Sequence, residues 1–271
     1  MKFQVACIQT NSSDDIDANI AVVGAMVREA HGQGAKLVAL PENVFCMEAP
    51  GSAARQMFTA ENHPGIAATR AWAKELGVWI LIGSLAVKID ESGKRVNRSL
   101  LIDDRGELIC HYDKIHLFDV TLSNGEIYSE SAKMLFGGKA VLAETPWGNL
   151  GLTVCYDVRF PNLYRSLAKA GADIIAVPAA FTAFTGNLHW HVLLRARAIE
   201  NGCYIIAPAQ AGTHPGGRQT YGHSLIVDPL GLVVAEKPDG VGVLLADIDR
   251  KHVDDARRMI PSLEHDRDFS F

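Results

Sequence analysis

A cysteine stands at the end of one apolar stretch of this chain, where it could act as a nucleophile. Cys155 closes the run Leu150–Cys155 and shortly precedes Pro161, which suits the first turn of a helix. Ligands of open α/β sheets bind beyond the carboxyl ends of strands, and a nearby helix N-terminus favours a thiolate. A free cysteine is also often a buried core residue, so its position alone does not make Cys155 catalytic.

A nucleophile needs a base and a positive charge nearby, and two residues could supply them. Glu42 directly follows Pro41 at the end of another apolar run, the same topological place as Cys155. Lys114 lies in a mixture of polar and aromatic residues, His111–Phe118, that reads as a loop. Taken singly, a loop glutamate and a loop lysine are usually solvated surface residues.

The combination of the three segments is more specific than any one of them. They read Leu-Pro-Glu-Asn around Glu42, Tyr-Asp-Lys-Ile-His-Leu-Phe around Lys114 and Gly-Leu-Thr-Val-Cys-Tyr-Asp-Val-Arg-Phe-Pro around Cys155. Together they strongly resemble the nitrilase superfamily of carbon–nitrogen hydrolases, from Val5 to near Pro261. The resemblance implies a Glu-Lys-Cys triad on a single domain, residues 1–271, folded as a four-layer α-β-β-α sandwich with two mixed sheets.

The implied reaction is hydrolysis of a small amide through a thioester acyl-enzyme. Burial should raise the pKa of Glu42 and Lys114 should oppose that rise, so we expect a pKa tuned part of the way upward. Glu42 would take the proton of Cys155 during attack and later give it to departing ammonia. The resemblance further implies that Lys114 and the backbone N–H of Tyr156 stabilise the oxyanion, and that Glu130 lines the site and positions the lysine or the substrate.

The substrate is expected to be a small amide that bears a carboxylate. Arg159, four residues after the cysteine, could anchor that carboxylate, although it could equally brace the next helix. In similar amidases the segment Pro178–Trp190 carries pocket residues. We therefore nominate Phe181 and Thr185 for substrate binding, with packing or helix capping as the alternative.

Within the superfamily, the chain looks most like the deaminated glutathione amidase branch. The residues behind this resemblance are Ala209–His214, Arg218, Tyr221–Ser224, Val227–Pro229 and Gly231. Leu230 departs from the pattern, since a tryptophan is usual there. An omega-amidase acting on 2-oxoglutaramate-type amides, or a nitrilase or other carbon–nitrogen hydrolase, is the alternative.

The elements that would position these residues alternate between strand and helix, which indicates an α/β fold. Helices are expected around Ile20–Ala30, over Pro161–Ala170 and over Leu188–Asn201, with Asn187 as the N-cap of the last. The expected strands are nearly continuous in apolar character, as for strands covered on both faces. They are Gln4–Gln9, Lys36–Leu40, Val78–Leu85, Leu150–Cys155, Asp173–Val177 and Cys203–Ala207.

Two hairpins predict that the sheets are mixed. Val96–Ile102 would pair with Glu107–Cys110, and Ser224–Asp228 with Leu232–Glu236, followed by a strand at Val241–Ile248. Family members commonly dimerise beside the active site, so a homodimer or higher homo-oligomer is expected. The last segment, Arg250–Arg258, could cross to the partner or form a surface helix.

Composition excludes several other classes of protein. A net charge of -5 with 21% charged residues argues against a nucleic-acid partner, and the absence of a long apolar run argues against a membrane protein. Five scattered cysteines without a CxxC pair favour the cytoplasm and argue against disulfides. His189 and His191 lie on different sides of a helix, and His214 and His223 on separate segments, so we expect no metal and no cofactor. A redox-sensing or binding protein is the non-enzymatic alternative.

Overall fold

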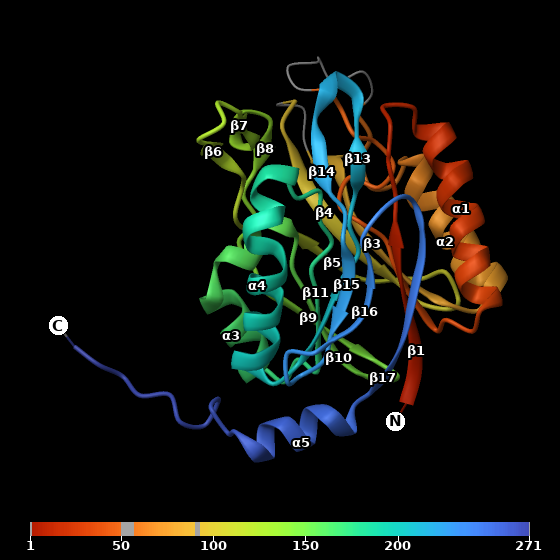
Figure 1. Ribbon diagram of the computed structural model, residues 1–271. Helices are drawn as coiled ribbons and strands as arrows, with labels where there is room; N and C mark the ends of the chain where they lie inside the picture. The colour runs from red at the N-terminus through yellow and green to blue at the C-terminus, as the bar shows by residue number, and fades with distance from the viewer. Residues whose placement is uncertain (1, 50–56, 90–92, 271) are drawn as a thin grey trace.

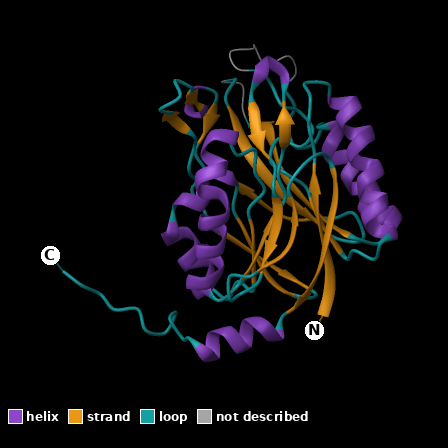
Figure 2. Ribbon diagram, viewed as in Figure 1, coloured by secondary structure: helices purple, strands orange, loops and turns teal. Residues whose placement is uncertain are grey.

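The two sheets of this chain pack face to face between two pairs of helices (Figure 1). The computed structural model describes residues 2–49, 57–89 and 93–270. Helices α1 and α2 cover the outer face of one sheet, and α3 and α4 cover the outer face of the other, as the colouring by secondary structure shows (Figure 2). The predicted four-layer α-β-β-α sandwich is confirmed.

The first sheet has the order β17-β1-β2-β3-β4-β5, with β8 beside β4. Strands β1, β2 and β3 are parallel to one another, whereas β17 is antiparallel to β1, β4 to β3, and β5 to β4, so the sheet is mixed. The strands are β1 (Lys2–Gln9), β2 (Leu37–Ala39), β3 (Trp79–Lys88), β4 (Arg95–Ile102), β5 (Leu108–Asp113), β8 (Met134–Leu135) and β17 (Gly242–Asp249).

The second sheet has the order β16-β15-β12-β11-β10-β9 and is also mixed, with a parallel centre of β10, β11 and β12. Its strands are β9 (Val141–Thr145), β10 (Gly148–Leu152), β11 (Ile174–Ala176), β12 (Tyr204–Ala207), β15 (Ser224–Val227) and β16 (Val233–Lys237). Two short ribbons stand apart from the main sheets: β6 (Asp119–Thr121) with β7 (Ile127–Ser129), and β13 (Ala211–Thr213) with β14 (Gln219–Tyr221).

Alternation along the central strands supplies both sides of the core. In β1, Val5 and Cys7 belong to the apolar cluster that includes the second sheet, while Ala6 and Ile8 belong to the cluster shared with α1 and α2. All four side chains are fully buried. A strand that is buried on both faces has no polar face, which is why its sequence is apolar throughout.

The helices are α1 (Ile16–Gly32), α2 (Pro64–Leu76), α3 (Pro161–Lys169), α4 (Ala183–Asn201) and α5 (Lys251–Met259). Helix α2 was not predicted from the sequence. It also placed the start of α4 too late: Thr182 is the N-cap and its hydroxyl accepts from the N–H of Thr185, so Asn187 lies inside the helix. The extended backbone of Thr182 ends the preceding loop there.

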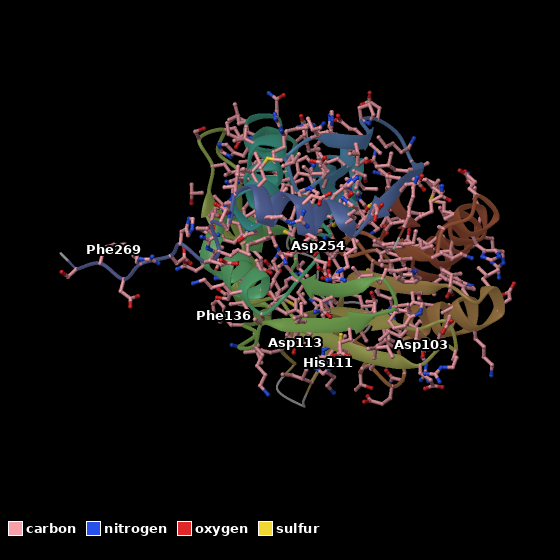
Figure 3. The ribbon with its side chains drawn as sticks, turned by 90° about the horizontal axis from the view of Figure 1, so that it is seen from below. Asp103, His111, Asp113, Phe136, Asp254 and Phe269 are labelled. Carbon is pink, nitrogen blue, oxygen red and sulfur yellow. The ribbon has the colours of Figure 1, made fainter. Side chains whose placement is uncertain are left out.

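Strand β10 is shorter than predicted, and Cys155 lies beyond it, at the first position of the 3-10 helix η2 (Cys155–Arg159). At the other end of the chain, α5 runs beneath the sandwich, and the segment after it extends away from the body to Phe269 (Figures 1 and 3). Within the described ranges, every helix is too short or too polar to cross a lipid bilayer.

Candidate active site

A cavity of about 390 Å³ opens where the carboxyl ends of strands from both sheets meet. Glu42 follows β2, Lys114 follows β5 and Cys155 follows β10, so each side chain leaves its sheet at the same edge. All three line the cavity. Parallel strands bring their carboxyl ends together, and that geometry gathers residues that are far apart in sequence.

Glu42 is almost wholly buried, with both carboxylate oxygens engaged. Its Oε1 accepts from Lys114 Nζ at 2.9 Å and from Asn97 Nδ2 at 2.9 Å, and its Oε2 accepts from the Ala180 N–H at 2.8 Å. Burial pushes its pKa up, but the charge and hydrogen bond of Lys114 and the hydrogen bond of the Cys155 thiol outweigh burial and leave the pKa below its ordinary value. The expected upward tuning was therefore wrong, because these donors all favour the carboxylate.

Lys114 is held between two carboxylates. Besides Glu42, its Nζ donates to Glu130 Oε2 at 2.9 Å and to Oε1 at 3.2 Å. Burial alone would lower the pKa of Lys114, yet Glu130 and Glu42 together raise it above its ordinary value, so the ammonium is kept charged. Glu130 is fixed in turn by the Phe118 N–H at 2.7 Å and by Asn97 Nδ2 at 3.0 Å.

Cys155 is held in a strained turn. Its φ is +49°, in the left-handed region that a residue with a Cβ rarely adopts, and its N–H donates to the Pro178 carbonyl at 2.9 Å. The next residue, Tyr156, lies in the first turn of η2, where backbone N–H groups have no acceptor within the helix. Both Cys155 and Tyr156 line the cavity.

Asp157 anchors this turn through hydrogen bonds. Its fully buried carboxylate accepts from the Val154 N–H at 2.8 Å, the Tyr112 hydroxyl at 2.8 Å and His116, whose Nδ1 lies 2.7 Å away. The Val154 bond closes the backbone around Cys155. The carboxylate therefore ties the turn to the end of β5, from which Lys114 also projects.

The surroundings of Cys155 disfavour its thiolate form. Burial is the largest cause that raises its pKa, the Glu42 carboxylate adds to it, and Lys114 only partly opposes it. We had expected the helix N-terminus to favour the thiolate, but burial beside a carboxylate disfavours a second negative charge more strongly. The charges of Glu42 and Lys114 are therefore favoured beside the cysteine, and a charge on the sulfur is not.

The family follows from comparison with known proteins. Residues 4–258 match the carbon–nitrogen hydrolase family model. A deaminated glutathione amidase from Synechocystis sp. is 41% identical over 266 residues, which cover 97% of each chain. This chain belongs to the carbon–nitrogen hydrolase family. The predicted membership of the nitrilase superfamily is thereby confirmed.

Solved structures resemble this carbon–nitrogen hydrolase closely. The NitFhit protein of C. elegans is 35% identical with a TM-score of 0.88; the match covers 98% of this hydrolase and 65% of that longer chain. A mutant of the amidase from Nesterenkonia sp. AN1, in which acrylamide has added to the active-site cysteine, is 26% identical with a TM-score of 0.81. That match covers 96% of this hydrolase and 98% of the amidase.

Two of the three residues predicted to bind substrate line the cavity, and the third does not. Phe181 and Thr185 line the cavity, and Thr185 also joins the cap of α4 through its hydroxyl, 2.7 Å from that of Thr182. Arg159 is not among the lining residues. Its guanidinium lies over the rings of Phe181 and Tyr156, with centroid distances of 5.1 and 5.9 Å, so it packs behind the wall of the cavity.

Three residues of the site were not found from the sequence. Asn97, in β4, bridges the two carboxylates that hold Lys114, and nothing in the predicted hairpin distinguishes it from other polar strand residues. Asp157 was part of the cysteine segment, but its anchoring role needs the fold to bring Tyr112 beside it. Arg218 lines the cavity and was noted only as part of a branch pattern.

Proposed function

We propose that this hydrolase cleaves the amide bond of small carboxylate-bearing amides through a thioester on Cys155, and that deaminated glutathione is its substrate. The observation that carries the proposal is that Cys155, Glu42 and Lys114 line one cavity, with the buried carboxylate of Glu42 2.9 Å from the Lys114 ammonium. A base, a nucleophile and a positive charge are then within reach of one carbonyl group.

Acylation begins with attack of Cys155 Sγ on the amide carbon while the thiol proton passes to Glu42. Negative charge develops on the former carbonyl oxygen. The Lys114 ammonium, which Glu42 and Glu130 hold beside the cavity, supplies the positive charge that stabilises this oxygen. The Tyr156 N–H is the second donor. Loss of one such donor typically raises the barrier by about 3–4 kcal/mol.

Collapse of the tetrahedral intermediate breaks the C–N bond. The leaving nitrogen takes the proton from Glu42 and departs as an amine, or as ammonia from a primary amide, and a thioester remains. Glu42, ionised again, takes a proton from a water molecule as the water attacks the thioester carbon. The second intermediate then expels the sulfur, which regains the proton from Glu42 as the acid is released.

Arg218 is the residue we propose for the substrate carboxylate, in place of Arg159. It lines the cavity, and among the described residues its buried Nε has no hydrogen-bond partner. One terminal nitrogen is fixed by the Ala180 carbonyl at 2.8 Å, next to the Glu42 contact. Guanidinium pairs well with carboxylate, and a cavity of about 390 Å³ lies within the usual range for small ligands.

The choice of deaminated glutathione rests on relatives that carry this activity in their names, from Synechocystis sp. to Homo sapiens. Deaminated glutathione has a carboxylate at each end, and its scissile amide releases a dipeptide amine. The test compares acid and amine release from deaminated glutathione, from 2-oxoglutaramate and from a matched nitrile. Turnover of 2-oxoglutaramate alone would overturn the substrate and leave an omega-amidase, while amide product from the nitrile without acid would point to nitrile chemistry.

Two arginine variants test the anchor. Arg218→Gln should raise KM by about tenfold or more with a smaller change in kcat, because it removes binding made before the chemical step. Arg159→Gln is the matched control and should change KM less. The reverse order would return the anchor to Arg159.

Self-association is the proposed quaternary arrangement, in line with the family resemblance. A stripe of apolar side chains on the outer face of α4 is exposed, with Leu188 at 56%, Val192 at 67% and Ile199 at 52%, and Leu232 is exposed at 61%. A second copy would cover this stripe. Val192→Glu should then shift the mass measured by sedimentation to that of one chain. Free, scattered cysteines favour a reducing compartment, and we propose the cytoplasm.

A further inference from the structure

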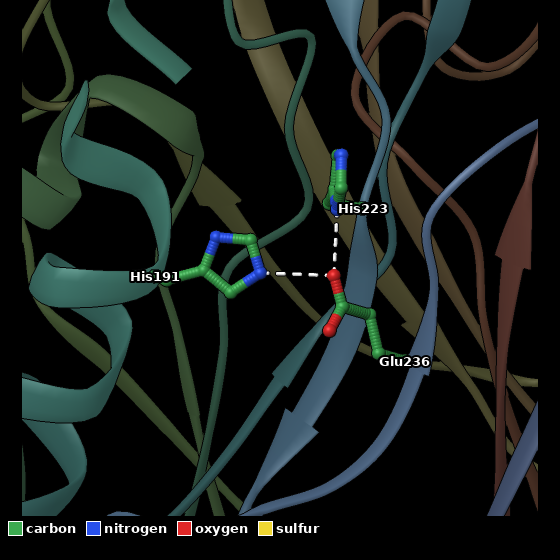
Figure 4. A group of neighbouring side chains, drawn as sticks. All are labelled: His191, His223 and Glu236. Atoms are coloured by element: carbon green, nitrogen blue, oxygen red, sulfur yellow. Dashed lines mark hydrogen bonds and ion pairs between the residues drawn. The ribbon is translucent and has the colours of Figure 1, made fainter. Parts of the chain in front are cut away.

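Two histidines and a glutamate meet outside the cavity, on the face where α4 approaches the second sheet (Figure 4). His191 Nε2 lies 2.9 Å from Glu236 Oε1, and His223 Nδ1 lies 2.6 Å from the same oxygen. His191 comes from α4, His223 from the turn between β14 and β15, and Glu236 from β16. None of the three lines the cavity, and the reaction proposed above uses none of them.

The surrounding structure holds these side chains in place. His223 has a φ of +53°, and its carbonyl accepts from the indole N–H of Trp190 at 2.8 Å, which fixes this strained turn to α4 one residue before His191. The ring of Tyr221 stacks on His223 with centroids 4.1 Å apart, and the His191 ring meets both edge to face. A strained backbone that is fixed on several sides is typical of a functional position.

The ligand chemistry is that of a transition-metal ion. We propose that His191, His223 and Glu236 bind one divalent ion of the zinc class, with water in the remaining position. Their candidate ligand atoms all lie within 4.8 Å of one another, and the side chains are 32%, 23% and 31% exposed, so an ion can enter from solvent. Two imidazoles and one carboxylate are a frequent zinc set, at about 2.0–2.2 Å from the ion.

The bound ion would stabilise the packing that supports one wall of the active-site cavity. Tyr221, which stacks on His223, donates its N–H to the Phe181 carbonyl at 2.9 Å, and Gly186 of α4 lies against its ring. Phe181 lines the cavity. An ion that joins α4 to β16 therefore stabilises the packing on which this wall rests. Its role is structural, and it leaves the metal-free chemistry at Cys155 unchanged.

The test is calorimetric titration of Zn²⁺ into the full chain after removal of metal with EDTA. The Cys155→Ser variant is the parent protein, so that the active-site thiol cannot bind the ion. We expect one Zn²⁺ per chain and a higher melting temperature with Zn²⁺ than without it. His191→Asn and Glu236→Gln should each weaken binding by at least about tenfold, since even outer-shell partners cost 10–100-fold. His189→Asn, two residues earlier on the same helix, should bind as the parent does.

A crystal of the parent soaked in Zn²⁺ gives a readout that does not depend on the folding of any variant. Anomalous scattering at the zinc edge should show a peak that contacts all three side chains. No calorimetric binding by the parent, equal affinity in His191→Asn and Glu236→Gln, or a peak elsewhere with none here would each overturn the proposal. None of these negative results would affect the amidase proposal, because that proposal is tested by amide turnover.

Discussion

Lys114 and Glu42 form an ion pair of 2.9 Å in which the side chains are only 2% and 4% exposed. Burying two charges is costly, and such pairs often contribute little net stability. The effect of the pair is on ionisation: the pKa of Glu42 lies below its ordinary value and that of Lys114 above it, so both side chains are kept charged beside Cys155. The pair therefore fixes the ionisation state of the site before a substrate arrives.

Replacing Cys155 with alanine should abolish amide turnover, with a loss of at least about 10⁴-fold in kcat, as for other covalent nucleophiles. The side chain is small and the turn is held by Asp157, so the melting temperature should change little. Amine release and circular dichroism measure the two effects. Cys110→Ala, outside the cavity, is the control. Measurable turnover in Cys155→Ala would exclude a thioester mechanism.

Glu42→Gln keeps the shape and hydrogen-bonding capacity of the side chain but cannot accept a proton. We expect kcat/KM to fall by about 10²–10⁴-fold, the usual contribution of general-base catalysis. The pKa of Glu42 lies below its ordinary value of 4.5. Protonation of Glu42 should therefore not reduce the activity of the wild-type enzyme until the pH falls below 4.5. Near-normal activity of Glu42→Gln would remove glutamate from this role.

Lys114→Met leaves the buried Glu42 and the half-buried Glu130 without their shared cation, and should destabilise the protein by about 3–5 kcal/mol in urea unfolding. The pH dependence should also reverse. In the wild type, the lowered pKa of Glu42 contributes stability that is present above the unfolded pKa and lost as pH falls through the folded one. In the variant, burial raises that pKa, so stability should be lost as pH rises.

A double variant separates the charge effect from loss of packing at Lys114. Adding Glu42→Gln to Lys114→Met removes one of the two uncompensated carboxylates and should restore part of the stability. If the double variant is no more stable than Lys114→Met, the lost ion pair is not the cause.

Asn97 is a positioning residue, since its Nδ2 donates to both carboxylates that hold Lys114. Asn97→Ala removes this donor and should cost about 1.5–3 kcal/mol of stability, the range for a hydrogen bond to a charged group. Asn97→Asp adds a third carboxylate and should be less stable still at pH 7. The order of the two melting temperatures decides the point, and equal values would contradict the bridging role.

Asp157→Asn replaces one carboxylate oxygen with an NH₂ group that cannot accept the hydrogen bonds now made there. We expect a loss of about 1–3 kcal/mol and a fall in kcat, because the turn around Cys155 relaxes. Tyr112→Phe removes only one of the bonds and is the control, with a smaller fall in kcat. A wild-type kcat in Asp157→Asn would show that the turn does not need this anchor.

The sequence by itself was sufficient to identify the family, the sandwich and the residues expected to react. Glu42, Lys114 and Cys155 lie in short, specific segments, and the strands that carry them are apolar because both faces are covered. These features are local, so they can be read along the chain. Helix α2 was missed. The start of α4 was misplaced because the residues around Thr182 show no apolar periodicity that would mark the beginning of a helix.

Only the tertiary structure decided the electrostatics and the partners of these residues. The pKa of Glu42 was predicted to rise and instead falls, because Lys114, Cys155 and Arg218 reach it from three separate segments. Arg218 reaches the cavity while Arg159 packs behind its wall, a difference that their sequence positions do not show. His191, His223 and Glu236 likewise have no common spacing. Contacts between distant segments depend on how the layers pack, and sequence periodicity carries no information about them.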